Sequence, residues 1–209
     1  MTHRAEIKIT VFSDYICPFC YVGHHRLMRL QDHYDLKINW CFLEIHPENS
    51  AAGEPVTDLD YSAEFWNELM LNLKRIAAEE SIPLAEHTFT TNSRDASLLA
   101  EAAKQRGRET FYRLHEKLFS SFFVEGKNIG DRDVLRKIAR ECDIDDAFIN
   151  AAWTDPAHPQ RLLANFEQAG RHQIKSVPSF AFGDRVLTGV VDEAVMREAA
   201  ASLIKTDFD

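Results

Sequence analysis

The sequence is poor in the residues that interrupt regular structure. Only 7 of its 209 residues are proline and 8 are glycine, and no repeat or low-complexity segment is present. Long disordered stretches are therefore not expected. Nor is there a run of 18 apolar residues, so no segment is predicted to span a membrane. Hydrophobic residues make up 45% of the chain, enough for a packed core.

Basic residues are in the minority as well. The chain has 24 Lys and Arg against 33 Asp and Glu, a net charge of −9 at pH 7. Nucleic acids and anionic lipids both recruit clustered Lys and Arg, so we expect no nucleic-acid partner and no membrane partner. Residues 1–7 have no apolar signal core and no small-residue cleavage site, which predicts a cytoplasmic protein.

The hydrophobic pattern predicts a β-α-β unit at the start of the chain. Residues 6–13 and 36–45 are rich in β-branched and aromatic residues, as buried strands are. A helix is expected between them over 18–33, with Pro18 in its first turn. A crossover of this kind is right-handed and joins parallel strands.

After a loop at 46–60 the period becomes helical until residue 171, and then returns to that of strands. Strands are expected at 179–182 and 185–188, joined by a turn at Gly183-Asp184, with a last helix over 192–204. The helices expected in the block lie at about 65–76, 93–105, 111–122, 131–142, 146–153 and 160–171. The block is rich in aromatic residues, Phe65, Trp66, Phe111, Phe122 and Phe123; most of them are expected in its core, and the others are candidates for a groove over Cys17.

Without the helical block, these elements form a four-stranded sheet with helices on both faces. The predicted fold class is therefore α/β, a thioredoxin fold with an all-α insertion domain after the second strand. Residues 1–60 and 157–209 are assigned to the thioredoxin-like domain, and residues 61–156 to the helical insertion domain.

The chain has four cysteines, and two of them form a Cys-x-x-Cys pair, Cys17 and Cys20. The pair follows a strand and a short loop, at the point where a helix begins. A helix N-terminus carries partial positive charge and unpaired N–H groups, and both stabilise a thiolate. We therefore expect Cys17 to be the attacking sulfur. Cys20 lies almost one helical turn further on, and we expect it to be less exposed and to resolve a mixed disulfide.

Two short segments are expected to contact the substrate of this pair. Pro18-Phe19 lies between the cysteines and influences the redox potential. Val177-Pro178 directly precedes a strand that the fold would bring against Cys17. A cis bond there would expose the backbone of Val177 for pairing with an extended substrate. The alternative is a trans proline at a strand start. The predicted substrate-binding residues are Pro18, Phe19, Val177 and Pro178.

Other uses of the cysteines are less favoured. Two cysteines can lie close together in a core without chemistry. A structural zinc site needs four ligands, usually from two separated pairs, and no second Cys-x-x-Cys accompanies His24 and His25, so no metal is predicted. Cys41 and Cys142 are expected in the core.

Glu44 and His46 follow the second strand, at the sheet edge where ligands bind in open α/β sheets. They are candidates for proton transfer at Cys20, although a solvated loop role is favoured.

Residues 12–23, Phe-Ser-Asp-Tyr-Ile-Cys-Pro-Phe-Cys-Tyr-Val-Gly, and residues 176–180, Ser-Val-Pro-Ser-Phe, resemble the DsbA-like thioredoxin-fold proteins, in the cytoplasmic branch called FrnE-like. The resemblance covers nearly the whole chain. It implies a cis Pro178, Cys17 as nucleophile, and oxidoreductase or disulfide-isomerase activity. For a protein of this activity we predict no cofactor, with glutathione as a candidate thiol partner, and thiol- or disulfide-bearing proteins or glutathione as the partners. Periplasmic members usually carry His where Phe19 stands, which argues against a strongly oxidising potential.

The same superfamily includes glutathione-using enzymes, the kappa-class transferases and hydroxychromene-carboxylate isomerases, which resemble this chain in domain order. They typically have Ser in place of the first cysteine and lack the second. The presence of both Cys17 and Cys20 weighs against them. A glutathione-dependent isomerase or transferase acting on a small molecule is thus the second interpretation. The oligomeric state does not follow from the sequence.

Overall fold

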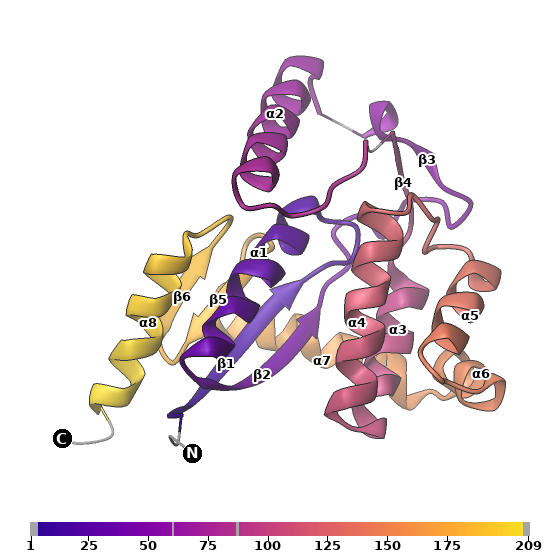
Figure 1. Cartoon of the computed structure of the whole chain (residues 1–209). Helices are drawn as coiled ribbons and strands as arrows, with labels where there is room; N and C mark the ends of the chain where they lie inside the picture. The colour runs from indigo at the N-terminus through magenta and orange to yellow at the C-terminus, as the bar shows by residue number, and fades with distance from the viewer. Residues whose placement is uncertain (1–3, 60, 87, 207–209) are drawn as a thin grey trace. The chain divides into compact units, whose positions relative to one another are not determined.

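The computed structural model describes residues 4–59, 61–86 and 88–206, and these form two compact units (Figure 1). The sheet unit comprises Met1–Leu43 and Asn165–Asp209, and the helical unit comprises Glu44–Ala164. Residue 60, at which the sequence places a domain boundary, lies outside the described residues, as do residues 1–3 of the segment used to predict localisation.

The sheet unit is built on four strands in the order β2-β1-β5-β6. β1 is central: it pairs in parallel with β2 from Glu6 opposite Asp35 to Ser13 opposite Phe42, and antiparallel with β5. β6 continues the sheet antiparallel to β5. The strands span Glu6–Ser13 (β1), Asp35–Phe42 (β2), Ser179–Phe182 (β5) and Arg185–Thr188 (β6). This confirms the predicted fold class, an α/β thioredoxin fold.

Helices cover both faces of this sheet. α1 (Pro18–Arg29, continued by the 3-10 turn η1, Leu30–Asp32) and α8 (Glu193–Thr206) lie on one face, and α7 (Ala157–Arg171) lies on the other (Figure 1). Ala169 of α7 packs against Phe12, Cys41 and Leu43.

β2 ends at Phe42, three residues before the predicted end. The reason lies in its neighbour. β1 ends at Ser13, whose carbonyl accepts a last hydrogen bond from the Leu43 N–H at 2.9 Å. Beyond Ser13 the chain turns toward Cys17, so β1 does not extend the parallel ladder past Leu43.

The helical unit is built around α3, α4, α5 and α6, whose apolar faces are buried against one another. Phe111, Phe122 and Phe123 are buried there as predicted. Phe65 is not: its side chain is 51% exposed, because α2 buries Leu73, Ile76 and Ala77, further along the helix. The helices span Ala63–Glu79 (α2), Arg94–Ala103 (α3), Arg108–Phe123 (α4), Arg132–Glu141 (α5) and Asp146–Thr154 (α6), with 3-10 turns at Val56–Asp58 (η2) and Lys104–Arg106 (η3).

The segment predicted as a loop at 46–60 is bound to the helical unit. β3 (Glu54–Pro55) pairs antiparallel with β4 (Phe89–Thr90). The Asn49 amide donates to the Thr90 hydroxyl at 3.0 Å, and the Asn128 amide donates to the Ala51 carbonyl at 2.9 Å. These bonds place the segment in the helical unit, whereas the sequence groups it with the thioredoxin-like domain.

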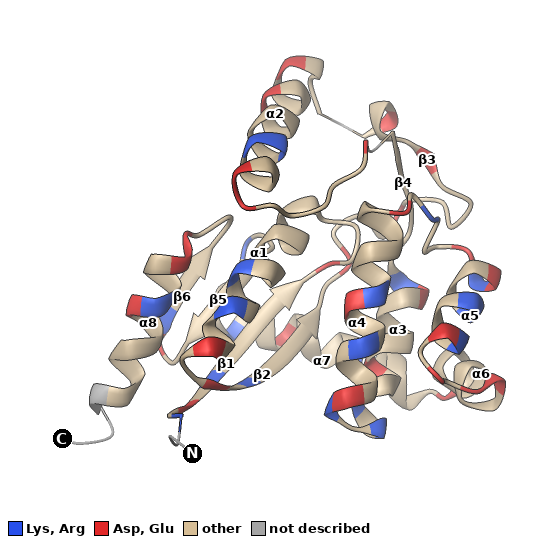
Figure 2. Ribbon diagram, viewed as in Figure 1, with Lys and Arg blue, Asp and Glu red and all other residues tan. Residues whose placement is uncertain are grey.

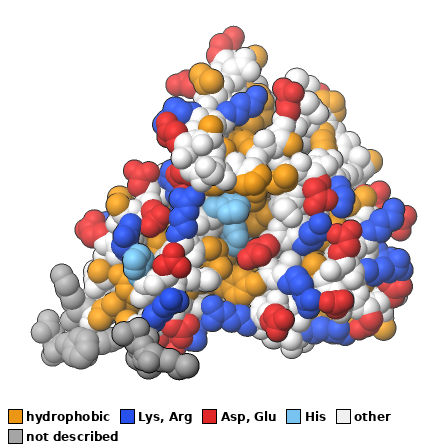
Figure 3. Space-filling view, in the orientation of Figure 1, with side chains coloured by type: hydrophobic (Ala, Val, Ile, Leu, Met, Phe, Trp, Pro, Cys, Tyr) orange, Lys and Arg blue, Asp and Glu red, His pale blue; other side chains and the backbone are white. Residues whose placement is uncertain are grey.

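Charges of both signs alternate along the surface helices (Figure 2). Lys117 pairs with Glu125 at 2.8 Å and Arg140 with Asp146 at 2.6 Å. Hydrophobic side chains also reach the surface, in and near α2 among other places (Figure 3), where Tyr61, Phe65 and Leu71 are exposed. In the part of the chain that is described, no helix combines the length and apolar character needed to cross a bilayer.

Candidate active site

A tight turn after β1 sets the position of Cys17. The carbonyl of Asp14 accepts a hydrogen bond from the Cys17 N–H at 3.2 Å, and the buried Asp14 carboxylate accepts one from the Ile16 N–H, also at 3.2 Å. An Asp side chain that bonds two residues ahead stabilises such turns. Cys17 thereby becomes the N-cap of α1 in an extended conformation, with Pro18 at the start of the helix.

The Cys17 and Cys20 side chains are free thiols on the first turn of α1. Cys20 is the more enclosed, at 2% exposed against 6% for Cys17, and its sulfur accepts a hydrogen bond from the Asp14 N–H at 3.4 Å. Burial raises the pKa of Cys20 well above its ordinary value, and the hydrogen bond and charge of Cys17 raise it further. The Asp14 backbone and the Ser13 side chain lower the pKa of Cys20, and these effects are smaller than those that raise it. Cys20 is therefore held as a neutral thiol at neutral pH.

The loop before β5 lies against Cys17. The Val177–Pro178 peptide bond is cis, the isomer that the resemblance implies. The thiol of Cys17 donates to the Val177 carbonyl, with sulfur and oxygen 3.9 Å apart. The sheet brings these segments together, because Phe12 of β1 pairs with Ser179, the residue after Pro178. We call residues 176–178 the proline loop.

Gly23 allows α1 to approach the proline loop closely. A Cβ atom at this position would lie 2.8 Å from the ring of Phe180 and 3.3 Å from Cγ of Pro178. Gly23 belongs to the motif at residues 12–23, but no role was predicted for it from the sequence. The signal was a glycine inside a predicted helix, which often indicates a close contact.

The other predicted residues are placed as follows. Pro18 and Phe19 are half-buried on the first turn of α1. Cys41 and Cys142 are buried, which confirms their core positions; their thiols donate to the Gln168 side chain at 3.4 Å and to the Arg113 carbonyl at 3.7 Å.

Glu44 and His46 contact side chains of the helical unit. The Glu44 carboxylate accepts from Arg94 at 2.7 Å, and the His46 ring lies 3.1 Å from Glu48. Proton transfer by either residue stays a prediction. Among the described residues, no group of three or more His, Cys, Asp or Glu side chains forms a candidate metal site.

The four-stranded sheet, the paired thiols at the start of α1 and the adjacent proline loop define a thioredoxin-fold protein. A family model, the DSBA-like thioredoxin domain, matches residues 8–201, and the chain belongs to this family of oxidoreductases and isomerases. Among curated proteins, it is 28% identical over 198 residues to YwbO, an uncharacterized protein of Bacillus subtilis. That match covers 92% of this chain and 95% of the relative.

Solved structures share the fold at low identity. A probable DsbA oxidoreductase from Streptomyces coelicolor is 22% identical with a TM-score of 0.84, covering 95% of this chain and 90% of that one. The cytosolic disulfide reductase DsbM from Pseudomonas aeruginosa is 16% identical with a TM-score of 0.69, covering 96% and 98%. A 2-hydroxychromene-2-carboxylate isomerase is 19% identical with a TM-score of 0.74, covering 97% and 100%.

Proposed function

We propose that this chain is a thiol–disulfide oxidoreductase in which Cys17 is the nucleophile and Cys20 the resolving thiol. The observation that carries the proposal is the arrangement of the two thiols. Cys17 is the N-cap residue of α1, and its thiol contacts the Val177 carbonyl. Cys20 lies three residues further along, is less exposed than Cys17, and has a raised pKa. Two thiols in one helical turn, unequal in burial, suit a sequential exchange of disulfides.

The reaction follows from this order. The Cys17 thiolate attacks one sulfur of a substrate disulfide, the substrate S–S bond breaks, and the leaving thiolate takes up a proton. Cys20 then loses its proton and attacks the Cys17 sulfur, which releases the second substrate thiol. The substrate disulfide is reduced to two thiols, and the protein dithiol is oxidised to a Cys17–Cys20 disulfide. Two molecules of a thiol such as glutathione restore the dithiol and become a disulfide themselves.

The substrate side of the site would be formed by Pro18, Phe19, Val177 and Pro178. An extended substrate chain would pair with the backbone of Val177 next to the reacting sulfur. We place the protein in the cytoplasm, in the FrnE-like branch, acting as a reductase or isomerase. Phe19 supplies no positive charge to stabilise the Cys17 thiolate, which fits a moderate potential. Glutathione is the proposed reductant, and a DsbM structure of the same fold was determined with GSH.

A glutathione-dependent isomerase or transferase is the second candidate. The observation that favours it is the fold shared with 2-hydroxychromene-2-carboxylate isomerase. In that case Cys17 would contact glutathione, and Cys20 would have no role in turnover.

Reduction of insulin with glutathione as electron donor tests the proposal. We expect Cys17→Ser to abolish turnover, because the attacking sulfur is lost. Cys20→Ser should accumulate a mixed disulfide with insulin, visible by mass spectrometry, because nothing resolves it. Cys142→Ala is the matched control, since Cys142 is a buried thiol of the helical unit, and it should keep wild-type turnover. Insulin reduction by Cys17→Ser at the wild-type rate would contradict the proposal. A Cys17→Ser variant active on an aromatic substrate with glutathione would favour the second candidate.

A further inference from the structure

Arg26 of α1 is a buried cation outside the Cys-x-x-Cys motif. It lies nine residues after Cys17, and its side chain is 6% exposed. A guanidinium group does not lose its proton in a protein, so burial requires acceptors for its N–H groups. The Arg26 guanidinium group must therefore be hydrogen-bonded within the sheet unit.

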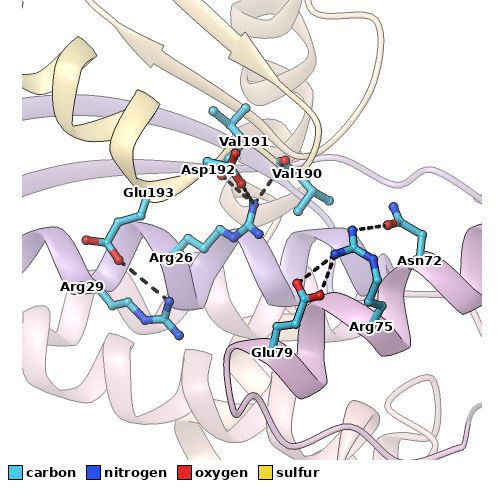
Figure 4. Close-up of polar contacts among 9 residues, drawn as sticks. All are labelled: Arg26, Arg29, Asn72, Arg75, Glu79, Val190, Val191, Asp192 and Glu193. Carbon is cyan, nitrogen blue, oxygen red and sulfur yellow. Dashed lines mark hydrogen bonds and ion pairs between the residues drawn. The ribbon is translucent and has the colours of Figure 1, made fainter.

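Arg26 reaches across to the segment that joins β6 to α8. Its Nη1 atom donates to the Val190 carbonyl at 3.2 Å and to the Val191 carbonyl at 2.9 Å, and it lies 3.3 Å from the Asp192 carboxylate (Figure 4). The Asp192 side chain is 79% exposed, so water screens that ion pair. The part-buried carbonyl contacts, which are charge-assisted hydrogen bonds, are the stronger link.

This segment in turn holds the proline loop. The Gly189 N–H donates to the carbonyl of Pro178 at 2.8 Å, directly before the residues that Arg26 contacts. The Val177 carbonyl accepts the thiol of Cys17. A short series of hydrogen bonds thus leads from α1 through residues 189–191 to the proline loop and back to Cys17, the N-cap of α1.

We propose that Arg26 is a positioning residue, which fixes the proline loop at the distance from Cys17 at which a disulfide substrate reacts. The inference rests on the proposed function and adds a third element to the site. Arg26 does not contact the sulfur atoms. It acts through the backbone of residues 189–191, which the variants below leave unchanged.

Arg26→Met tests the role, because methionine keeps most of the side chain's length and removes its donors. We expect the KM for insulin to rise about tenfold, since a displaced proline loop pairs less well with the extended substrate chain and its contribution to substrate binding is lost. The rate at which iodoacetamide alkylates Cys17 should stay within about twofold of wild type, because this small reagent needs no proline loop. Arg26→Lys keeps the charge and one donor direction, so it should give an intermediate KM.

Arg29→Met is the matched control. Arg29 lies on the same helix, is more exposed, and pairs with Glu193 at 3.8 Å (Figure 4). Its KM for insulin should equal that of wild type. The proposal is overturned by a wild-type KM in Arg26→Met, or by a loss of Cys17 alkylation that parallels the loss of turnover. If Arg26→Met does not fold, Arg26→Lys decides: a raised KM at an unchanged thermal midpoint supports the role, and a wild-type KM overturns it.

Failure of the proposed function is distinguishable from failure of this inference. Insulin reduction by Cys17→Ser would remove the proposed function whatever Arg26 does. An inactive Cys17→Ser together with a wild-type KM in Arg26→Met would remove only the role of Arg26.

Discussion

His24 is a buried histidine one helical turn beyond Cys20, with its ring 5.7 Å from that of Trp40. Burial, helped by the charge of His25, lowers the pKa of His24 to about 3. The unfolded chain binds this proton near pH 6.5, as an ordinary histidine does. Between these two values the unfolded state binds more protons, so His24 favours the folded state above pH 6.5 and loses that contribution on acidification.

We therefore expect the free energy of unfolding to fall by up to about 1.4 kcal/mol per pH unit below pH 6.5 through this residue. Urea denaturation at a series of pH values measures the slope. His24→Gln should flatten it, whatever its effect on stability at pH 7. His33→Gln, at an exposed position, is the control and should keep the wild-type slope. Equal slopes in wild type and His24→Gln would contradict this prediction.

At the site, some residue positions follow from local sequence features and others do not. The positions of Cys17 and Pro18 followed from a strand, a loop and a helix start, which are local features. The role of Gly23 did not, because its contacts, Pro178 and Phe180, lie more than 150 residues away in the sequence. Nor did the proposed role of Arg26, because two of its three acceptors are backbone carbonyls, which residue type does not reveal.

At the scale of elements, the close approach of α1 to the proline loop can be tested with one methyl group. Gly23→Ala places a Cβ 2.8 Å from the Phe180 ring, so the buried ring, α1 or β5 must shift. We expect a loss of about 1–3 kcal/mol in urea denaturation, typical of overpacking. The kcat/KM for insulin should fall as well, because the shift moves Cys17 relative to Val177.

Gly170→Ala is the matched control for this substitution. Gly170 lies in α7 and a Cβ there meets nothing within 4 Å. Alanine should stabilise the helix by about 0.5–1 kcal/mol and leave turnover unchanged. If Gly23→Ala were as stable and active as Gly170→Ala, the packing argument would be wrong.

Element types were predicted well where a segment was long and periodic. The four strands of the sheet and the long helices follow from alternation and from the 3.6-residue period. β3 and β4 were not predicted, because strands of two residues have no period, and Pro55 argued against one. Phe65 is exposed although its spacing from Leu69 and Leu73 fits a buried helix face, because spacing does not show where along a helix the burial begins.

At the scale of the whole molecule, the four cysteines make a countable prediction. All four are free thiols in this structure, and only Cys17 and Cys20 lie on one helical turn. Mild oxidation should therefore remove two of the four thiols, as counted with a chromogenic disulfide after denaturation. Peptide mapping should locate the bond between Cys17 and Cys20. A bond that includes Cys41 or Cys142 would contradict the assignment of these two as core residues.

The sequence by itself predicted the four strands of the sheet, the long helices, the fold class and the Cys-x-x-Cys pair at the start of a helix, because these follow from patterns of residues close together in the chain. Tertiary structure decided what surrounds the pair. It set the Val177 carbonyl beside Cys17, enclosed Cys20 and linked Arg26 to the segment after β6. Those contacts join residues about 160 positions apart, and they form only when the pairing of β1 with β5 closes the sheet.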